Sequence, residues 1–141
     1  MNSDSSPTTP GSNGSLPFFE EGVAAGFPSP VMGKLSSSLN LNTLCVQHPA
    51  TTYFVRARGE SMTGAGIDDG DILVVDRSLQ PRNGQIVIAA IDGEFTVKRL
   101  RIQGSRVILA PENPNFAPRT LTHDEVSEFF GVVTWILKAA N

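Results

Sequence analysis

The sequence predicts a mainly β fold, in which a small domain of short twisted strands follows a flexible N-terminal arm. From Tyr53 onward, short runs of β-branched and aromatic residues alternate with clusters of turn residues, and helical periodicity is scarce. The chain has 141 residues, of which 40% are apolar, enough for one compact core but not for a second full domain. The opening residues, by contrast, offer almost nothing to bury.

The strands are expected between well-marked turns. Asp92-Gly93 is the clearest hairpin turn, because both residues tolerate the positive φ that a tight primed turn requires. Before the strands, Leu39–Val46 predicts one or two helical turns with Asn40 or Asn42 as the N-cap. The expected strands are Tyr53–Arg58, Asp71–Asp76, Gln85–Ile91, Glu94–Leu100, Arg106–Leu109 and Val126–Leu137.

The N-terminal region has a different composition. Residues 1–15 are rich in Ser, Thr, Pro, Gly and Asn, so we expect this arm to be disordered. The glycines and prolines of residues 22–30 cannot sustain a helix, and this segment should be extended. Every charge before Lys34 is negative, and the remaining body is balanced between acidic and basic side chains.

Charge and cysteine content exclude several classes of protein. The net charge of −3 and the pI near 5.3 argue against direct nucleic-acid binding as the main function, because that requires a basic surface. A single cysteine, Cys45, excludes an internal disulfide and a zinc site of several thiols, and we expect it to be a buried core residue. Neither a secretory signal nor a membrane-spanning run is expected, so we place the protein in the cytoplasm.

Asp68-Asp69-Gly70-Asp71 is the one segment that looks like a metal site. It has the opening of a calcium loop but lacks the distal glutamate, so we expect a turn. We therefore expect neither a metal nor a cofactor.

Gly59-Glu60-Ser61-Met62 is a candidate nucleophile motif between a strand and a glycine-rich turn. Glycine before a serine permits a sharp bend that exposes the hydroxyl, and the following amides could face a developing oxyanion. A serine beside a glycine is, however, most often an ordinary turn residue. The motif therefore needs a base before it indicates catalysis.

Two kinds of base are available to Ser61. A Ser-His-Asp triad would combine it with His48 or His123 and with Asp71 or Asp76, although neither histidine is tied to Ser61 by sequence. The other candidate is Lys98, which strand alternation places on one face with Thr96 and Leu100, opposite Phe95, Val97 and Arg99. A lysine acts as a base only when burial lowers its pKa, and most lysines on strands are solvated.

A resemblance to a known family favours the lysine. The matching stretches are Ala25–Pro30, Gln47–Val55, Gly59–Met62, Gly70–Asp76 and Asp92–Lys98, in this order, and the similarity runs from about Leu16 to the C-terminus. They resemble the UmuD branch of the LexA/UmuD family of self-cleaving serine peptidases. The resemblance implies a nucleophile at Ser61, a base at Lys98, oxyanion donors at the Ser61 and Met62 amides, and a scissile bond between Ala25 and Gly26.

The resemblance also implies a biological role. Residues 1–25 would be the arm removed on cleavage, and residues 26–141 the Ser-Lys peptidase domain and polymerase-accessory body. The family implies stimulation by a RecA filament on single-stranded DNA, a homodimer, and a Y-family polymerase partner in error-prone translesion synthesis during the SOS response. Cleavage within one chain and cleavage between dimer mates both remain open.

The sequence departs from the family at its start, because its N-terminal arm differs from the usual opening. No helix-turn-helix precedes the peptidase part, which disfavours a repressor that reads DNA. One alternative is a polymerase-binding or regulatory module that never cuts itself, although intact Ser61 and Lys98 argue against it. Another is a signal-peptidase-like enzyme with the same residue pair, which would require a membrane anchor.

Overall fold

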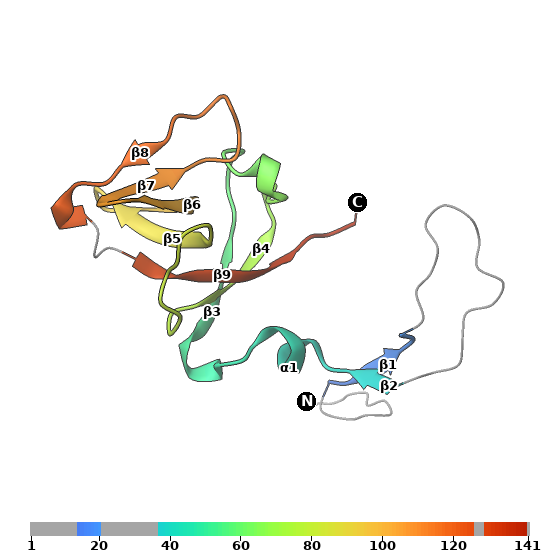
Figure 1. Cartoon of the computed structure of the whole chain (residues 1–141). Helices are drawn as coiled ribbons and strands as arrows, with labels where there is room; N and C mark the ends of the chain where they lie inside the picture. Colours follow the sequence, from blue (N-terminus) through green and yellow to red (C-terminus); the bar gives the residue numbers. More distant parts are fainter. Residues whose placement is uncertain (1–13, 21–36, 126–128, 141) are drawn as a thin grey trace. The chain divides into compact units, whose positions relative to one another are not determined.

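The computed structural model describes residues 14–20, 37–125 and 129–140 (Figure 1). These residues belong to two compact units, residues 1–47 and residues 48–141, which are described separately. The predicted scissile pair Ala25-Gly26 and most of the predicted N-terminal arm lie outside the described residues. No helix in the described ranges is long and apolar enough to cross a membrane.

The first unit contains a small sheet and one short helix. β1 (Leu16–Phe18) and β2 (Ser37–Leu39) pair antiparallel, and α1 (Leu41–Cys45) follows. The Asn40 side chain caps α1 by accepting a hydrogen bond of 3.1 Å from the Thr43 amide, as one of the two predicted caps. Cys45 is buried, as predicted.

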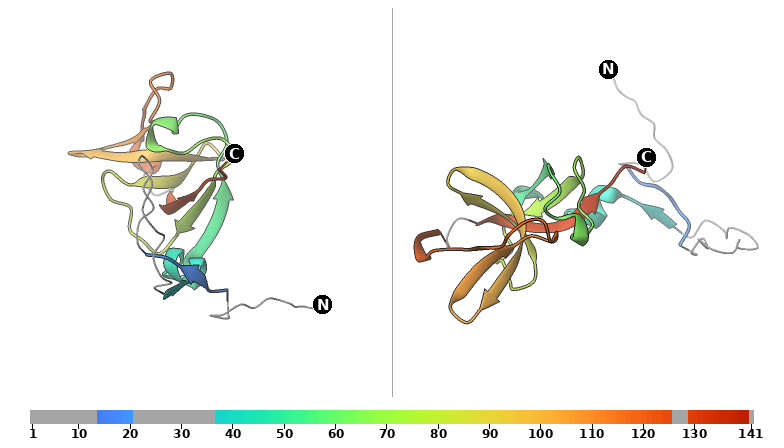
Figure 2. Two further views of the ribbon diagram at one scale, coloured as in Figure 1. Left: turned by 90° about the vertical axis from the view of Figure 1, so that its right-hand side faces the viewer. Right: turned by 90° about the horizontal axis from the view of Figure 1, so that it is seen from above.

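The second unit is a seven-stranded antiparallel sheet with strand order β3-β4-β9-β5-β6-β7-β8, and the predicted mainly β class is confirmed. Figure 2 shows that its strands turn progressively, so the sheet is strongly twisted. Short 3-10 helices η1 (Pro49–Thr51), η2 (Thr63–Ala65) and η3 (His123–Glu125) lie in the connections. The strands are β3 (Thr52–Arg56), β4 (Ile72–Asp76), β5 (Ile86–Ile91), β6 (Glu94–Gln103), β7 (Arg106–Ala110), β8 (Arg119–Thr120) and β9 (Phe129–Leu137).

Two hydrophobic clusters stabilise this sheet, one on each face of β5. Val87 and Ile88 are neighbours in β5, so their side chains point to opposite faces, and each belongs to a different cluster. Leu73 and Met62 pack with Ile88, whereas Leu100 packs with Val87. Each fully buried aliphatic side chain contributes roughly 1.5–3 kcal/mol to folding. The first cluster contains Met62, the residue after Ser61, and therefore holds the candidate site in place.

The β5–β6 hairpin positions Lys98. Its turn has positive φ at Asp92 (53°) and Gly93 (81°), which confirms the predicted hairpin. From Glu94 to Arg99, β6 pairs with β5, and from Arg99 to Gln103 it pairs with β7. Within the described sheet, β6 therefore has an unpaired edge from Glu94 to Lys98, on the side away from β5.

The predicted turn at Asp68-Asp69-Gly70-Asp71 is also confirmed. The Asp71 amide donates to the Asp68 carbonyl at 3.1 Å, and Lys138 pairs with the carboxylates of both residues. The pKa of Asp71 is below its usual value, first because Lys138 donates a hydrogen bond to its carboxylate and second because the Asp68 amide donates to it at 2.8 Å. The turn thus uses a lysine ammonium as the counter-ion for its carboxylates.

Gly131 is a position where the fold leaves no room for a side chain. Its φ is +142°, and a Cβ there would lie 2.5 Å from Val75 Cγ1 and 3.2 Å from the Asp76 carbonyl oxygen. We expect Gly131→Ala to lower the free energy of unfolding by about 2–5 kcal/mol, because backbone strain and overpacking add. Chemical denaturation measures this loss.

The matched control is Gly104→Ala. Gly104 also has a positive φ, +62°, but no atom lies within 4 Å of its added Cβ. This variant should lose only about 1–2 kcal/mol, from backbone strain alone. Equal losses in the two variants would contradict the predicted close packing at Gly131.

Candidate active site

The Ser61 loop connects β3 to β4 and is shaped by glycine. Gly59 has a φ of +84°, which favours glycine, and its amide donates to the Asp69 carboxylate at 2.7 Å. The next turn is anchored by Met62, whose side chain is only 2% exposed. Ser61 lies between the bend at Gly59 and the buried Met62, and it is half-buried. Its hydroxyl faces a cavity that it helps to line.

The connection after β7 holds the Ser61 loop from a second side. The Glu112 amide donates to the Ser61 carbonyl at 2.7 Å, and the Gly64 amide donates to the Glu112 carbonyl at 2.7 Å. A Cβ on Gly64 would lie 2.5 Å from that carbonyl oxygen, so this approach requires glycine. The Asn113 side chain donates to the Glu60 carbonyl at 2.8 Å, and Arg99 of β6 pairs with the Glu112 carboxylate at 3.0 Å. The loop is thereby connected to the strand that carries Lys98.

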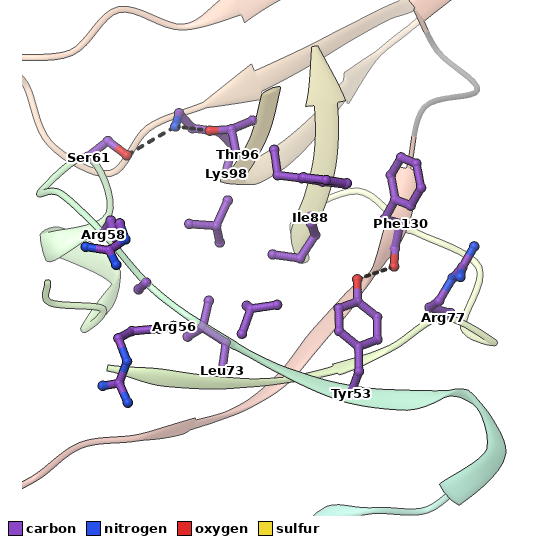
Figure 3. Close-up of a pocket in the computed structure, with 14 residues that line it drawn as sticks. Tyr53, Arg56, Arg58, Ser61, Leu73, Arg77, Ile88, Thr96, Lys98 and Phe130 are labelled. Carbon is purple, nitrogen blue, oxygen red and sulfur yellow. Dashed lines mark hydrogen bonds between the residues drawn. The ribbon is translucent and has the colours of Figure 1, made fainter. Parts of the chain in front are cut away.

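Lys98 reaches Ser61 from β6. Its Nζ lies 3.1 Å from Ser61 Oγ and 2.6 Å from Thr96 Oγ1 (Figure 3). Thr96 precedes Lys98 by two residues, so strand alternation places both side chains on one face, as predicted, and Leu100 on that face is buried. Thr96 was not predicted from sequence as a hydrogen-bond partner of Lys98, although its place on the same face of the strand indicated that the two side chains could meet.

Burial sets the protonation of Lys98. The side chain is half-buried, and desolvation lowers the pKa of its ammonium below the ordinary lysine value. The cavity that Lys98 shares with Ser61 has no acidic residue in its lining, and desolvation accounts for the lowered pKa. The amine is therefore neutral in a larger fraction of molecules than a surface lysine would be.

The histidine alternative for the base is not assembled around Ser61. His48 Nδ1 lies 2.6 Å from Asp76 Oδ2, but neither residue lines the cavity. Burial would raise the Asp76 pKa, but hydrogen bonds from His48, Ser78 and Thr51 lower it far below its usual value. In a triad, one histidine nitrogen contacts the serine hydroxyl and the other contacts the carboxylate. Here Ser78 Oγ and Asp76 both lie beside His48 Nδ1, with Ser78 Oγ at 3.4 Å, so Ser78, His48 and Asp76 do not form a triad.

The remaining candidates for a triad, Asp71 and His123, do not line the cavity beside Ser61. Asp71 pairs with Lys138, and His123 lies in η3 after the last residues of β8. Of the bases proposed from sequence, Lys98 is the one that hydrogen-bonds with Ser61, whereas His48 and Asp76 pair with each other away from it. In the described ranges, no group of three or more His, Cys, Asp or Glu side chains could hold a metal ion.

The cavity beside the pair has a volume of about 750 Å³ and two distinct ends. Ser61, Lys98 and Arg58 lie at one end, and Tyr53, Phe130 and Arg77 lie at the other (Figure 3). Between them the wall is apolar. The other lining residues are Val55, Arg56, Ala57, Leu73, Ile88, Phe95, Thr96 and Val97. An elongated apolar cavity that ends at a hydroxyl and an amine suits an extended peptide better than a compact polar ligand.

Comparison with known proteins identifies the family of this chain. Residues 17–134 match the model of the family described as Peptidase S24-like. The chain is 49% identical over 121 residues to Protein MucA of Escherichia coli, covering 85% of this chain and 82% of that protein. It is 49% identical over 123 residues to Protein ImpA of Shigella flexneri, and these residues cover 86% of this chain and 82% of that protein.

A repressor is also similar to this chain. LexA repressor 1 of Pseudomonas syringae pv. tomato is 47% identical over 96 residues, which cover 68% of this chain and 47% of the repressor. The family match spans most of the chain and includes both Ser61 and Lys98. The chain therefore belongs to the Peptidase S24-like family, as a UmuD-type member of the LexA/UmuD family of self-cleaving serine peptidases.

Proposed function

We propose that the protein cuts its own Ala25–Gly26 bond, with Ser61 as the nucleophile and Lys98 as the base. The observation that carries this proposal is the 3.1 Å approach of Lys98 Nζ to Ser61 Oγ in a half-buried position. A hydroxyl is a weak nucleophile until an adjacent base removes its proton, and a desolvated amine provides that base near neutral pH. Family membership supports the same reaction.

The chemistry follows from these positions. Neutral Lys98 takes the Ser61 proton as Oγ bonds to the Ala25 carbonyl carbon, which gives a tetrahedral oxyanion. The resulting ammonium returns the proton to the Gly26 nitrogen, the C–N bond breaks, and water then hydrolyses the acyl-enzyme. The backbone amides of Ser61 and Met62 are the proposed oxyanion donors, and neither donates a hydrogen bond to any residue that the structure describes.

The wider role rests on the family and has three parts. Removal of residues 1–25 would leave residues 26–141 as the accessory subunit of a Y-family polymerase in SOS mutagenesis, working in the cytoplasm. A RecA filament on single-stranded DNA would stimulate cutting by favouring the conformer with the scissile segment docked. The trimmed product would act as a homodimer, without direct nucleic-acid contact.

Exposed apolar side chains support the homodimer. Phe54 pairs with Val74 across β3 and β4, and Val74 pairs with Trp135 across β4 and β9, so these three side chains share one face of the sheet. Phe54 is 56% exposed and Trp135 is 41% exposed. Large exposed apolar groups gathered on one sheet face are typical of a protein interface.

Self-cleavage should depend on pH in one direction. Raising the pH through the lowered pKa of Lys98 deprotonates the amine, so the cutting rate should rise with pH and then level off. We expect the purified protein to yield a fragment that begins at Gly26, identified by mass spectrometry after incubation at alkaline pH or with activated RecA.

Substitutions at the proposed site test the same reaction. Ser61→Ala and Lys98→Ala should each abolish the fragment, and Ala25→Asp or Gly26→Glu should block docking of the scissile segment.

Three results would count against the proposal. Cutting by Ser61→Ala would exclude this nucleophile, and a normal rate in Lys98→Ala would exclude this base. If the unaltered chain gave no Gly26 fragment under either condition, the protein would be a polymerase-binding or regulatory module that does not cut itself. Circular dichroism of each variant shows whether the fold is intact.

The protonation of Lys98 can be measured without cleavage. Lys34, Lys98 and Lys138 are the only lysines of the sequence, so NMR titration of lysine side chains in the Ser61→Ala protein is tractable. We expect the pKa of Lys98 to be lower than that of Lys138, which hydrogen bonds from Asp68 and Asp71 raise. Thr96→Val should lower the Lys98 pKa further, because it removes an acceptor of the ammonium.

Thr120→Val is the matched control for this substitution, since Thr120 lies in the exposed strand β8. It should leave the titration of Lys98 unchanged. An ordinary lysine pKa at Lys98 in the unaltered site would remove the physical basis for its role as a base.

A further inference from the structure

Two consecutive backbone carbonyls of the Ser61 loop are held from the same side. The Asn113 side chain donates to the Glu60 carbonyl at 2.8 Å, and the Glu112 amide donates to the Ser61 carbonyl at 2.7 Å. Glu112 and Asn113 are neighbours in the connection after β7, and neither lines the cavity that Ser61 borders. These two donors therefore hold the loop from outside the cavity.

Each of these carbonyls shares a planar peptide group with the amide of the next residue. The Glu60–Ser61 and Ser61–Met62 bonds are both trans, so within each group the C=O and the N–H point in opposite directions. A donor that fixes the Glu60 carbonyl therefore also fixes the direction of the Ser61 N–H. In the same way, a donor on the Ser61 carbonyl fixes the Met62 N–H. Both N–H groups are thus directed away from Glu112 and Asn113.

We infer that Asn113 is a positioning residue for the oxyanion donors of this site. It lies outside the cavity and acts through the Glu60–Ser61 peptide group, whose N–H would face the developing negative charge. This inference rests on the proposed function, in which the Ser61 and Met62 amides stabilise the oxyanion. It goes beyond that function by giving a role in the reaction to a side chain 53 residues after Glu60.

The two amides have the hydrogen-bonding state that this role requires. Neither the Ser61 N–H nor the Met62 N–H donates to any residue that the structure describes. Most buried N–H groups in proteins have a partner, and Met62 is only 2% exposed. An oxyanion in front of both groups would supply that partner.

The hydrogen bonds of Asn113 define which of its atoms faces Glu60. Its Oδ1 accepts from the Asn115 amide at 2.9 Å, and a backbone N–H can only donate, so the atom left for the Glu60 carbonyl is the nitrogen Nδ2. Nδ2 also lies 3.4 Å from Thr63 Oγ1. One side-chain amide thus contacts the loop on both sides of Ser61, which limits rotation of the loop about the nucleophile.

The residue before Asn113 anchors this support to the sheet. The Glu112 carboxylate pairs with Arg99 at 3.0 Å and with Arg101 at 3.5 Å, both in β6. Its backbone carbonyl accepts from the Gly64 amide at 2.7 Å. The strand that carries the base therefore also supports the segment that orients the donors. Donors fixed in advance can stabilise a transition-state charge without reorganising during the reaction.

Asn113 also forms a turn of its own, and this local role can be separated from the orienting role. Its Oδ1 accepts from the Asn115 amide at 2.9 Å, and its carbonyl accepts from the Phe116 amide at 3.1 Å. Neither bond uses Nδ2. Asn113→Asp keeps the shape of the side chain and both acceptors, but it removes the donor to the Glu60 carbonyl.

The test compares self-cleavage by Asn113→Asp with self-cleavage by the unaltered chain. We expect the rate constant at the plateau of the pH profile to fall by about tenfold to thirtyfold, because the donors lose their fixed direction. The midpoint of the profile should not move, since the contacts of Lys98 with Ser61 and Thr96 are retained. Asn113→Ala should show a similar loss, which would exclude the added charge as its cause.

The matched control is Asn115→Asp. It adds the same charge to the same connection, at an exposed residue whose side chain makes no hydrogen bond with any part of the chain that the structure describes. This variant should cut at about the unaltered rate. Chemical denaturation of each variant shows whether the protein stays folded under the conditions of the cleavage assay.

Amide NMR spectra supply a signal that a simple loss of stability would not produce. They are recorded at acidic pH, where Lys98 is protonated and cutting is slow. The Ser61 amide resonance should move in Asn113→Asp, because a hydrogen bond to a carbonyl polarises the whole peptide group. The Met62 amide resonance should move less, because the Glu112 amide still holds the preceding carbonyl.

The possible outcomes separate this inference from the proposed function. If the unaltered chain cut itself and Asn113→Asp cut within about twofold of its rate, the role of Asn113 would be overturned and the peptidase retained. An equal loss in Asn115→Asp, or equal shifts of the Ser61 and Met62 amides, would overturn the role as well. Failure of the unaltered chain to cut would overturn the proposed function, and this inference with it.

Discussion

The site depends on one costly contact, the approach of a lysine amine to a serine hydroxyl in a half-buried position. Water stabilises an ammonium strongly, so removing part of that water from Lys98 lowers its pKa and disfavours the charged form. That penalty is tolerable only because Thr96 and Ser61 accept hydrogen bonds from Nζ. The rest of the second unit can be understood as the means of holding these three side chains together.

Two features of the sheet hold them. β6 pairs with β5 on one side along its first half and with β7 along its second half, so Lys98 lies next to the point where its strand changes partner. Arg99, the next residue, pairs with Glu112, whose backbone hydrogen-bonds with the Ser61 loop. Strand pairing of β6 therefore positions Lys98, and the Arg99–Glu112 ion pair connects the same strand to the loop that carries Ser61.

Much of this architecture could be predicted from sequence because it is local. The Asp92-Gly93 turn, the cap at Asn40 and the alternation that places Thr96 with Lys98 each depend on a few neighbouring residues. The pairing of β1 with β2 could not be predicted, since these three-residue strands are separated by many residues and have no strong pattern. The same limit applies to His48: its sequence context gives no sign of Asp76, which lies 28 residues away. Ser61 and Lys98 are 37 residues apart, and only the family resemblance brought them together before the fold was known.

In the proposed self-cleavage, the tether between substrate and site lets the cavity be selective with few contacts. A segment of the same chain, or of a bound second copy, is present at high effective concentration, so binding affinity is not what limits docking. What remains is register, because a slip by one residue would present the Ala24 or Gly26 carbonyl to Ser61 and would turn every side chain to the other face.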